Sequence, residues 1–211
     1  MNFNKSYSIF FVLLVICLVG CQPYRCLLGC EFYVCPLESS KLTDFSKIID
    51  KSFDDTWKAL VQYVDGSFFS IDNFEKDSGL LTLSFGASNP SEFITGGLYM
   101  FSNLSRSFDG DYVDWLTQYE NGKLNAKMDI IATELNSNKT QVTVMARYIL
   151  ISSIPNLFPD STKTWEFESG RCITQYPMWK LRSGSLFYSD KRTICPTYKA
   201  EKEILDAIES L

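Results

Sequence analysis

The sequence predicts an α+β domain in which helices cover one face of an antiparallel sheet. Two amphipathic helices are expected over residues 53–64 and 198–211, on either side of a run of strands. The strands read as alternating apolar and polar residues separated by turn-forming residues. Helices that flank such a run favour α+β over a parallel α/β sheet. We therefore expect a helix in the N-terminal half and the C-terminal helix to pack on the sheet, in a helix-grip-like arrangement.

The first strand is expected over residues 45–51, and the first helix follows it directly. Ser52 offers an N-cap and Asp55 stands in the capping-box position. The apolar residues after Ser52 recur at the spacing of one helix face; they are Phe53, Trp57, Leu60, Val61 and Val64. Asp65-Gly66 ends the helix.

The strands after this helix follow from turns and alternation. Two apolar runs at 67–73 and 80–85, separated by a turn that ends in glycine, predict a hairpin. The runs 124–134 and 141–151 alternate on either side of an Asn-rich turn and predict a second hairpin. A further strand is expected over 162–167, and Thr197 is expected to cap the last helix.

Residues 86–122 are rich in glycine and aromatic side chains and give no clear period. Long irregular segments in compact domains are usually functional or partly structured. One interpretation is a strand or two with aromatic pairs across neighbouring strands. The other is an exposed aromatic surface for interaction, whose candidate residues are Tyr99, Phe101, Phe108, Tyr112 and Trp115.

The N-terminus carries an export signal. Residues 9–19 are an unbroken apolar run behind a leader whose only charge is Lys5, which is typical of a secretory signal peptide. The run is too short to span a bilayer, which takes about 20 apolar residues. A buried core segment and an ordinary cleaved signal are the alternatives. Leu18-Val19-Gly20-Cys21 resembles a bacterial lipobox, which implies that Cys21 is acylated and becomes the new N-terminus. A second match that ends at Cys30 is disfavoured because Arg25 interrupts the apolar run.

This signal divides the chain into a signal peptide (1–20), a lipidated tether (21–45) and a single α+β domain (46–211). Gln22, in place of Asp, resembles an outer-membrane sorting signal, so we expect an outer-membrane protein that faces the periplasm. The formal net charge of −5 and the absence of a basic run in the sequence argue against nucleic acid and against binding to anionic lipid by charge. The membrane contact is therefore expected through the lipid on Cys21.

The cysteines of an exported chain can form disulfides. Cys172 and Cys195 flank a polar segment and are expected to pair, which contributes about 3 kcal/mol in the chain-entropy model. For Cys26, Cys30 and Cys35, three alternatives stay open: a local disulfide that leaves one free thiol, a metal site, or a bond to another chain. A disulfide is favoured over a metal because the chain has no histidine.

The first helix and hairpin resemble a known family. Phe53-Asp-Asp-Thr-Trp57 with Leu60, and the turn Glu75-Lys-Asp-Ser-Gly-Leu-Leu-Thr82, are similar to the helix and the turn of BamC-type outer-membrane lipoprotein domains. The resemblance covers about residues 46–85 well and 123–211 loosely. It implies a helix-grip type of fold in an envelope lipoprotein.

Function is predicted mainly by exclusion. Without histidine, the chain has neither a Ser-His-Asp nor a Cys-His arrangement, and it has no Gly-rich phosphate loop. We expect no catalysis, cofactor or metal, and an envelope protein as partner. The alternative is a carrier that holds a small ligand or lipid between sheet and helices, with lining residues such as Phe68, Leu83, Phe167 and Ile204.

Replacing Cys21 with Ser tests the anchor. The hydroxyl cannot take the thioether-linked lipid, so the variant should lose palmitate labelling and remain uncut by lipoprotein signal peptidase. Labelling that persists in the variant would contradict the assignment of Cys21.

Overall fold

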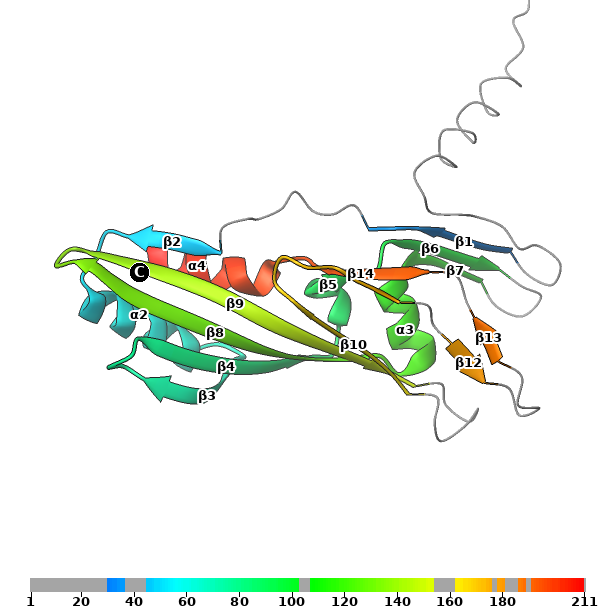
Figure 1. The fold of residues 1–211 in the computed structure, drawn as a ribbon, viewed down its shortest axis with the longest axis horizontal. Coiled ribbons are helices and arrows are strands. Elements are labelled where there is room, and N and C mark those ends of the chain that lie inside the picture. Colours follow the sequence, from blue (N-terminus) through cyan, green and yellow to red (C-terminus); the bar gives the residue numbers. More distant parts are fainter. Residues whose placement is uncertain are drawn as a thin grey trace, which may run out of the picture.

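The computed structural model describes residues 30–36, 45–102, 107–153, 162–175, 178–180, 186–188 and 191–210. It confirms the predicted class, because antiparallel sheets dominate and a helix of the N-terminal half and the C-terminal helix both pack on the main sheet (Figure 1). The predicted signal peptide and Cys21 lie outside the described residues.

The main sheet has six antiparallel strands in the order β10-β9-β8-β4-β3, with β2 pairing with β9. Their bounds are β2 Ser46–Ile49, β3 Ser70–Glu75, β4 Leu80–Ala87, β8 Lys123–Asn136, β9 Lys139–Ser152 and β10 Lys163–Glu168. All six strands correspond to predicted ones. The structure extends the second hairpin by one to two residues at the strand ends, because pairing continues almost to the turn.

The β8–β9 hairpin forms the middle of the sheet and runs along most of the molecule (Figure 1). Every second side chain is buried from Leu124 to Ala132 on β8 and along β9, and β4 repeats the pattern. The buried set includes Leu83, Met128, Ile130, Val142 and Val144, all fully enclosed. One face of the sheet is therefore part of the core, and the other is left to solvent.

Helix α2 (Phe53–Asp65) covers part of the buried face. Its N-cap forms as predicted: the Asp55 amide donates to the Ser52 hydroxyl at 3.1 Å. Trp57 and Leu60 point into the core and are 3% and 0% exposed. The helix ends at Gly66, whose amide bonds the Val64 carbonyl.

Helix α4 (Lys199–Ser210) lies beside α2 on the same face. Its first turn is held by a buried carboxylate: Glu201 accepts hydrogen bonds from the Tyr148 hydroxyl at 2.8 Å and the Ser169 hydroxyl at 2.6 Å. Burial beside this carboxylate raises the pKa of Tyr148. A buried carboxylate is costly unless it is hydrogen-bonded, so these two bonds fix the start of α4 against β9 and the end of β10.

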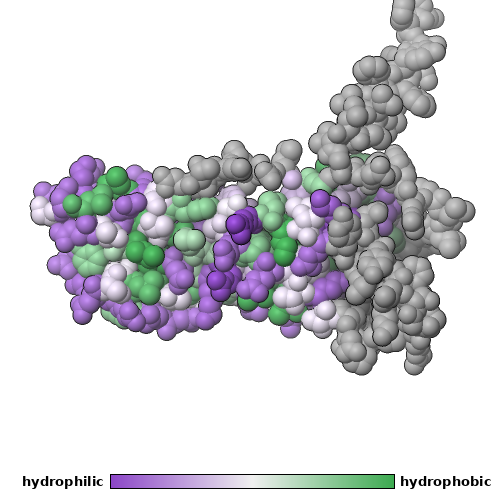
Figure 2. All heavy atoms as spheres, viewed as in Figure 1, coloured by the Kyte–Doolittle hydropathy of each residue, from purple (hydrophilic) through white to green (hydrophobic). Residues whose placement is uncertain are grey.

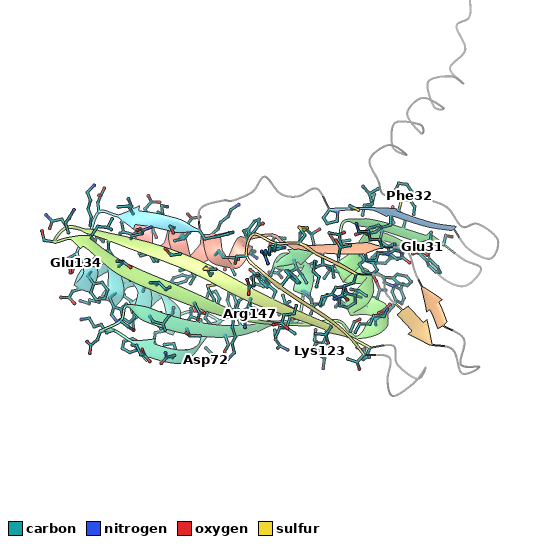
Figure 3. All side chains as sticks on the ribbon, in the orientation of Figure 1. Glu31, Phe32, Asp72, Lys123, Glu134 and Arg147 are labelled. Carbon is teal, nitrogen blue, oxygen red and sulfur yellow. A yellow bond between two sulfur atoms is a disulfide. The ribbon has the colours of Figure 1, made fainter. Side chains whose placement is uncertain are left out.

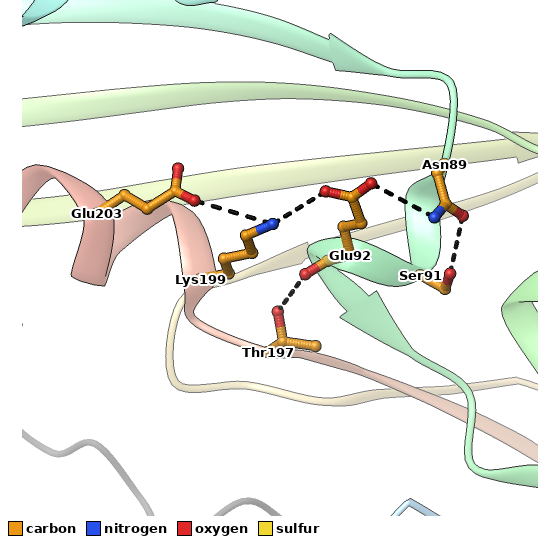
Figure 4. Close-up of polar contacts among 6 residues, drawn as sticks. All are labelled: Asn89, Ser91, Glu92, Thr197, Lys199 and Glu203. Carbon is orange, nitrogen blue, oxygen red and sulfur yellow. Dashed lines mark hydrogen bonds and ion pairs between the residues drawn. The ribbon is translucent and has the colours of Figure 1, made fainter. Parts of the chain in front are cut away.

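A second polar group ties α4 to the short helix η2 (Pro90–Glu92), as Figure 4 shows. The Lys199 ammonium contacts the Glu92 carboxylate at 2.9 Å. Thr197, predicted to cap α4, instead donates its hydroxyl to the Glu92 carbonyl at 3.0 Å. The capping prediction is therefore wrong, because α4 begins at Lys199 and the residue before it is Tyr198, while the Thr197 hydroxyl joins this segment to η2.

The segment predicted as irregular contains regular structure. It forms β5 (Ile94–Thr95), β6 (Leu98–Ser102), β7 (Ser107–Asp111) and helix α3 (Tyr112–Glu120). The interpretation as strands with aromatic pairs is confirmed for β6 and β7, where Phe101 stands opposite Phe108, whereas α3 was not predicted. Asp111 caps α3 by accepting from the Val113 amide at 2.7 Å, and Asn121 ends it in the left-handed conformation. Near α3, strand β14 (Arg192–Pro196) pairs with β5 and with β11 (Ile173–Gln175), and β12 (Met178–Lys180) pairs with β13 (Leu186–Tyr188).

Strand β1 (Cys30–Val34) lies within the segment predicted to be a tether, yet it pairs along its whole length with β6. Tyr33 explains why this part is folded. Its ring is 6% exposed and belongs to the core, and its hydroxyl both donates to the Thr193 carbonyl and accepts from the Thr193 amide, at 3.0 and 2.8 Å. The fold therefore includes chain that precedes Phe45.

The predicted disulfide between Cys172 and Cys195 is confirmed. It joins the residue before β11 to β14. Cys35 is disulfide-bonded as well, while Cys26 lies outside the described residues. Among the helices of the described chain, none is long and apolar enough to cross a membrane.

Candidate interaction face

The uncovered face of the main sheet is the candidate functional site; we call it the open face. It consists of the alternate side chains of β2, β4, β8, β9 and β10 that point away from α2 and α4. Figure 2 shows polar and apolar side chains intermixed over these strands. Three large apolar residues are among the most exposed here: Ile131, Met145 and Ile48, at 43%, 50% and 58%. Burying such side chains is favourable, at about 25 cal/mol per Å² of apolar area.

Two neighbouring clefts hollow the open face. The larger, about 570 Å³, runs from Phe68 across Ser84 and Asn125 to Ile149 and Glu166. The smaller, about 230 Å³, is lined by Asp129, Ile131, Thr143, Met145 and Glu168 among others. Lys127 and Arg147 border both clefts, so the two adjoin at this pair of cations, and together we call them the depression.

Lys127 and Arg147 stand directly opposite each other on β8 and β9 (Figure 3 labels Arg147). Like charges placed opposite on neighbouring strands repel and destabilise the pair. Each cation has one carboxylate beside it. Glu168 of the neighbouring strand β10 lies 3.3 Å from the Arg147 guanidinium, and Asp72 of β3, one strand beyond β4, lies 3.4 Å from the Lys127 ammonium.

These charges remain accessible. The side chains of Lys127 and Arg147 are 70% and 58% exposed. A hydrogen bond from Ser84 at 2.8 Å, with a smaller contribution from Lys127, lowers the pKa of Asp72 and keeps it ionised. The open face thus offers a cation pair within a depression edged by apolar side chains, an arrangement suited to an acidic and apolar partner surface.

A second charged cluster is buried in the region around α3. The Arg192 side chain is 2% exposed and forms an ion pair with Glu31 of β1. Its guanidinium carbon lies 4.5, 5.3 and 5.4 Å from the ring centroids of Tyr33, Tyr99 and Tyr112. These distances are those of cation–π contacts, which are strongest when desolvated. Burial raises the pKa of Tyr99 and Tyr112.

This arginine joins four elements, because its partners come from β1, β6 and α3 while Arg192 itself belongs to β14. A buried charge without partners would cost several kcal/mol. The Arg192 Nε is buried without a hydrogen-bond partner among the described residues, whereas the ion pair and the three ring contacts hold the rest of the guanidinium. We interpret the cluster as a structural clamp on β1.

Lys163 and Glu120 form a third buried contact, with the ammonium 3.5 Å from the carboxylate. Their side chains are 12% and 6% exposed. Burial lowers the pKa of Lys163 to about 8, although the attraction of Glu120 opposes this shift. Burial likewise raises the pKa of Glu120, against the opposing effects of Lys163 and of the Ser152 hydroxyl at 3.1 Å.

The predicted aromatic interaction surface is wrong as a surface. Tyr99 and Tyr112 are 5% and 3% exposed and cannot be contacted from outside. Phe101, Phe108 and Trp115 are partly buried against the core and against one another, with ring centroids 5.1 to 5.4 Å apart for the contacts of Trp115 with the two phenylalanines. These aromatic rings fill the space between the β6–β7 hairpin and α3.

The residues that make up the open face were not singled out by the sequence analysis. The available signal was the strict alternation of β8 and β9, which shows which side chains share the outer face but not which cations meet. Among the described residues, no group of three His, Cys, Asp or Glu side chains is placed to hold a metal ion.

Comparison of the chain with protein-family models, with curated proteins and with solved structures finds no match. The resemblance to BamC-type domains therefore stays a prediction.

The Lys163–Glu120 contact predicts a pH dependence of stability. The unfolded Lys163 has the ordinary pKa of 10.5 and the folded one a pKa of about 8. Between these values the unfolded chain binds more protons, so this residue makes the free energy of unfolding rise with pH. Below pH 8, the buried charge of Lys163 lowers the free energy of unfolding by about 3 kcal/mol, and this loss is recovered by about pH 10.5.

Urea denaturation at about pH 8 and about pH 10 measures this effect. The free energy of unfolding should rise more between these pH values in the wild-type protein than in Lys163→Met, because methionine carries no charge at either pH. Lys139→Met, at an exposed lysine beside Asp50, is the matched control. Equal pH dependence in the wild-type protein and Lys163→Met would contradict the assignment.

Proposed function

We propose that this protein is a lipid-anchored bacterial envelope protein that binds a protein partner through the open face of its main sheet and performs no catalysis. The observation that carries the proposal is the depression on this face, with Lys127 and Arg147 at its centre and exposed apolar side chains around it. Surfaces that combine apolar residues with a few accessible charges are typical of protein interfaces.

The size of the open face fits this role. It extends over the 14-residue strands β8 and β9 and onto β4 and β10. A strand rises about 3.3 Å per residue and neighbouring strands lie about 4.8 Å apart. Such a face can offer the roughly 800 Å² per partner that a stable interface needs.

The anchor and the place of action rest on the sequence. The lipobox-like end of the apolar run supports acylation of Cys21, and Gln22 supports the outer membrane facing the periplasm. The resemblance to BamC-type domains supports an envelope lipoprotein.

A carrier with a cavity between sheet and helices has less support. Three of the four residues expected to line that cavity, Leu83, Phe167 and Ile204, are 0%, 5% and 0% exposed and belong to the core cluster. The fourth, Phe68, is 52% exposed and lines the larger cleft. Tyr148 stacks on Phe167 with ring centroids 5.5 Å apart. Both clefts described above lie on the opposite side of the sheet.

Photocrosslinking in intact cells tests the proposed binding face. p-Benzoylphenylalanine placed at Met145, on the rim of the smaller cleft, should yield a defined protein adduct. Charge reversal by Lys127→Glu with Arg147→Glu should reduce that adduct about tenfold or more, because like charges across an interface cost several kcal/mol.

Lys139→Glu, at the tip of the hairpin and away from both clefts, is the control and should leave the adduct unchanged. A protein adduct that survives the double reversal, or no protein adduct at all, would overturn the proposed function.

A further inference from the structure

Sheet β1-β6-β7 carries an apolar patch of its own, separate from the open face. Phe32 pairs with Met100 and Val34 pairs with Leu98 across β1 and β6. Val34, Met100 and Leu98 are 37%, 40% and 43% exposed, and Phe32 is half-buried. We call these four side chains the apolar patch.

The patch lies on the outer side of this sheet. Tyr33 and Tyr99, the alternate residues of the same strands, are buried against Tyr112 and Arg192 on the inner side. Successive side chains of a strand point to opposite faces. Figure 3 shows the consequence at β1, where Phe32 and Glu31 lie on opposite sides of the strand.

We propose that the apolar patch rests on the lipid bilayer to which the protein is anchored. This inference depends on the proposed acylation of Cys21. Only eight residues, or nine residue steps, separate Cys21 from the start of β1 at Cys30. A chain of that length spans at most about 30 Å, and a flexible one about 15–18 Å on average.

The strand nearest to the anchor is itself part of the patch and is held firmly to the domain. Glu31 forms an ion pair with buried Arg192, and Tyr33 is hydrogen-bonded to Thr193. Movement of β1 toward the membrane surface therefore brings the whole β1-β6-β7 sheet with it.

The area of the patch favours lipid over a protein partner. The exposed area of these four partly covered side chains falls well short of the roughly 800 Å² that each side of a stable protein interface buries. A bilayer contact needs no such area, because two or more acyl chains already hold the protein at the membrane. The patch then has only to orient the domain.

The charges near the patch indicate which kind of lipid headgroup it can approach. The described strands of this sheet contain no lysine or arginine, and the exposed Asp109 of β7 stands opposite Met100. This carboxylate is repelled by an anionic surface. The patch therefore suits a zwitterionic leaflet, with its apolar side chains in the boundary between headgroups and acyl chains.

Photocrosslinking to lipid tests this inference with the full lipidated protein in phosphatidylcholine vesicles. p-Benzoylphenylalanine at Leu98 should give adducts with lipid acyl chains, whereas the same probe at Met145 on the open face should give none. Met100 provides a second position in the patch if the substitution at Leu98 impairs folding. Adding phosphatidylglycerol should not increase the yield.

Equal lipid adducts at Leu98 and Met145, or adducts at Leu98 only to a second protein chain, would overturn the inference. The intact mass of the purified protein separates the two proposals. Unacylated protein overturns the anchor and this inference together, whereas acylated protein without adducts at Leu98 or Met100 overturns this inference alone.

Discussion

The structure depends on the strict alternation of the β8–β9 hairpin. From Leu124 to Ala132 on β8 and from Val142 to Leu150 on β9, every second side chain is apolar and points inward. A register slip by one residue would reverse both faces, so the alternation fixes how β4 and β10 pair on either side. Helices α2 and α4 cover the inner face, and Glu201 holds the start of α4 there through Tyr148 and Ser169. The accessible face follows from this one-sided covering.

The buried charges and the exposed charges have different roles. Arg192 and Glu201 join elements that are distant in sequence, and each has its partners within the fold. Lys127 and Arg147 are placed opposite each other at a cost, relieved by the neighbouring carboxylates Asp72 and Glu168. The fold does not require two cations to stand side by side on an exposed face. We therefore read Lys127 and Arg147 as part of a binding surface, and Arg192 and Glu201 as part of the structural network.

Local signals predicted much of this fold. The capping box at Ser52 predicted the start of α2, and the alternating runs predicted the main strands. Helix α3 was missed because its aromatic residues favour strands, although Tyr112, Trp115 and Tyr119 recur at helical spacing. Burial of Arg192 depends on tyrosines from three other elements, and the depression around Lys127 depends on pairing between strands. Such non-local contacts leave no signal in a short stretch of sequence.

Hydroxyl-radical oxidation of methionines tests the central claim, that the open face is a binding surface in the cell. Met145 is 50% exposed on that face and Met128 on the same hairpin is 0% exposed. In the purified protein, Met145 should oxidise readily and Met128 should not. In intact cells, the account predicts that Met145 is protected by its partner while Met128 stays unreactive. Equal oxidation of Met145 in cells and in the purified protein would contradict the account.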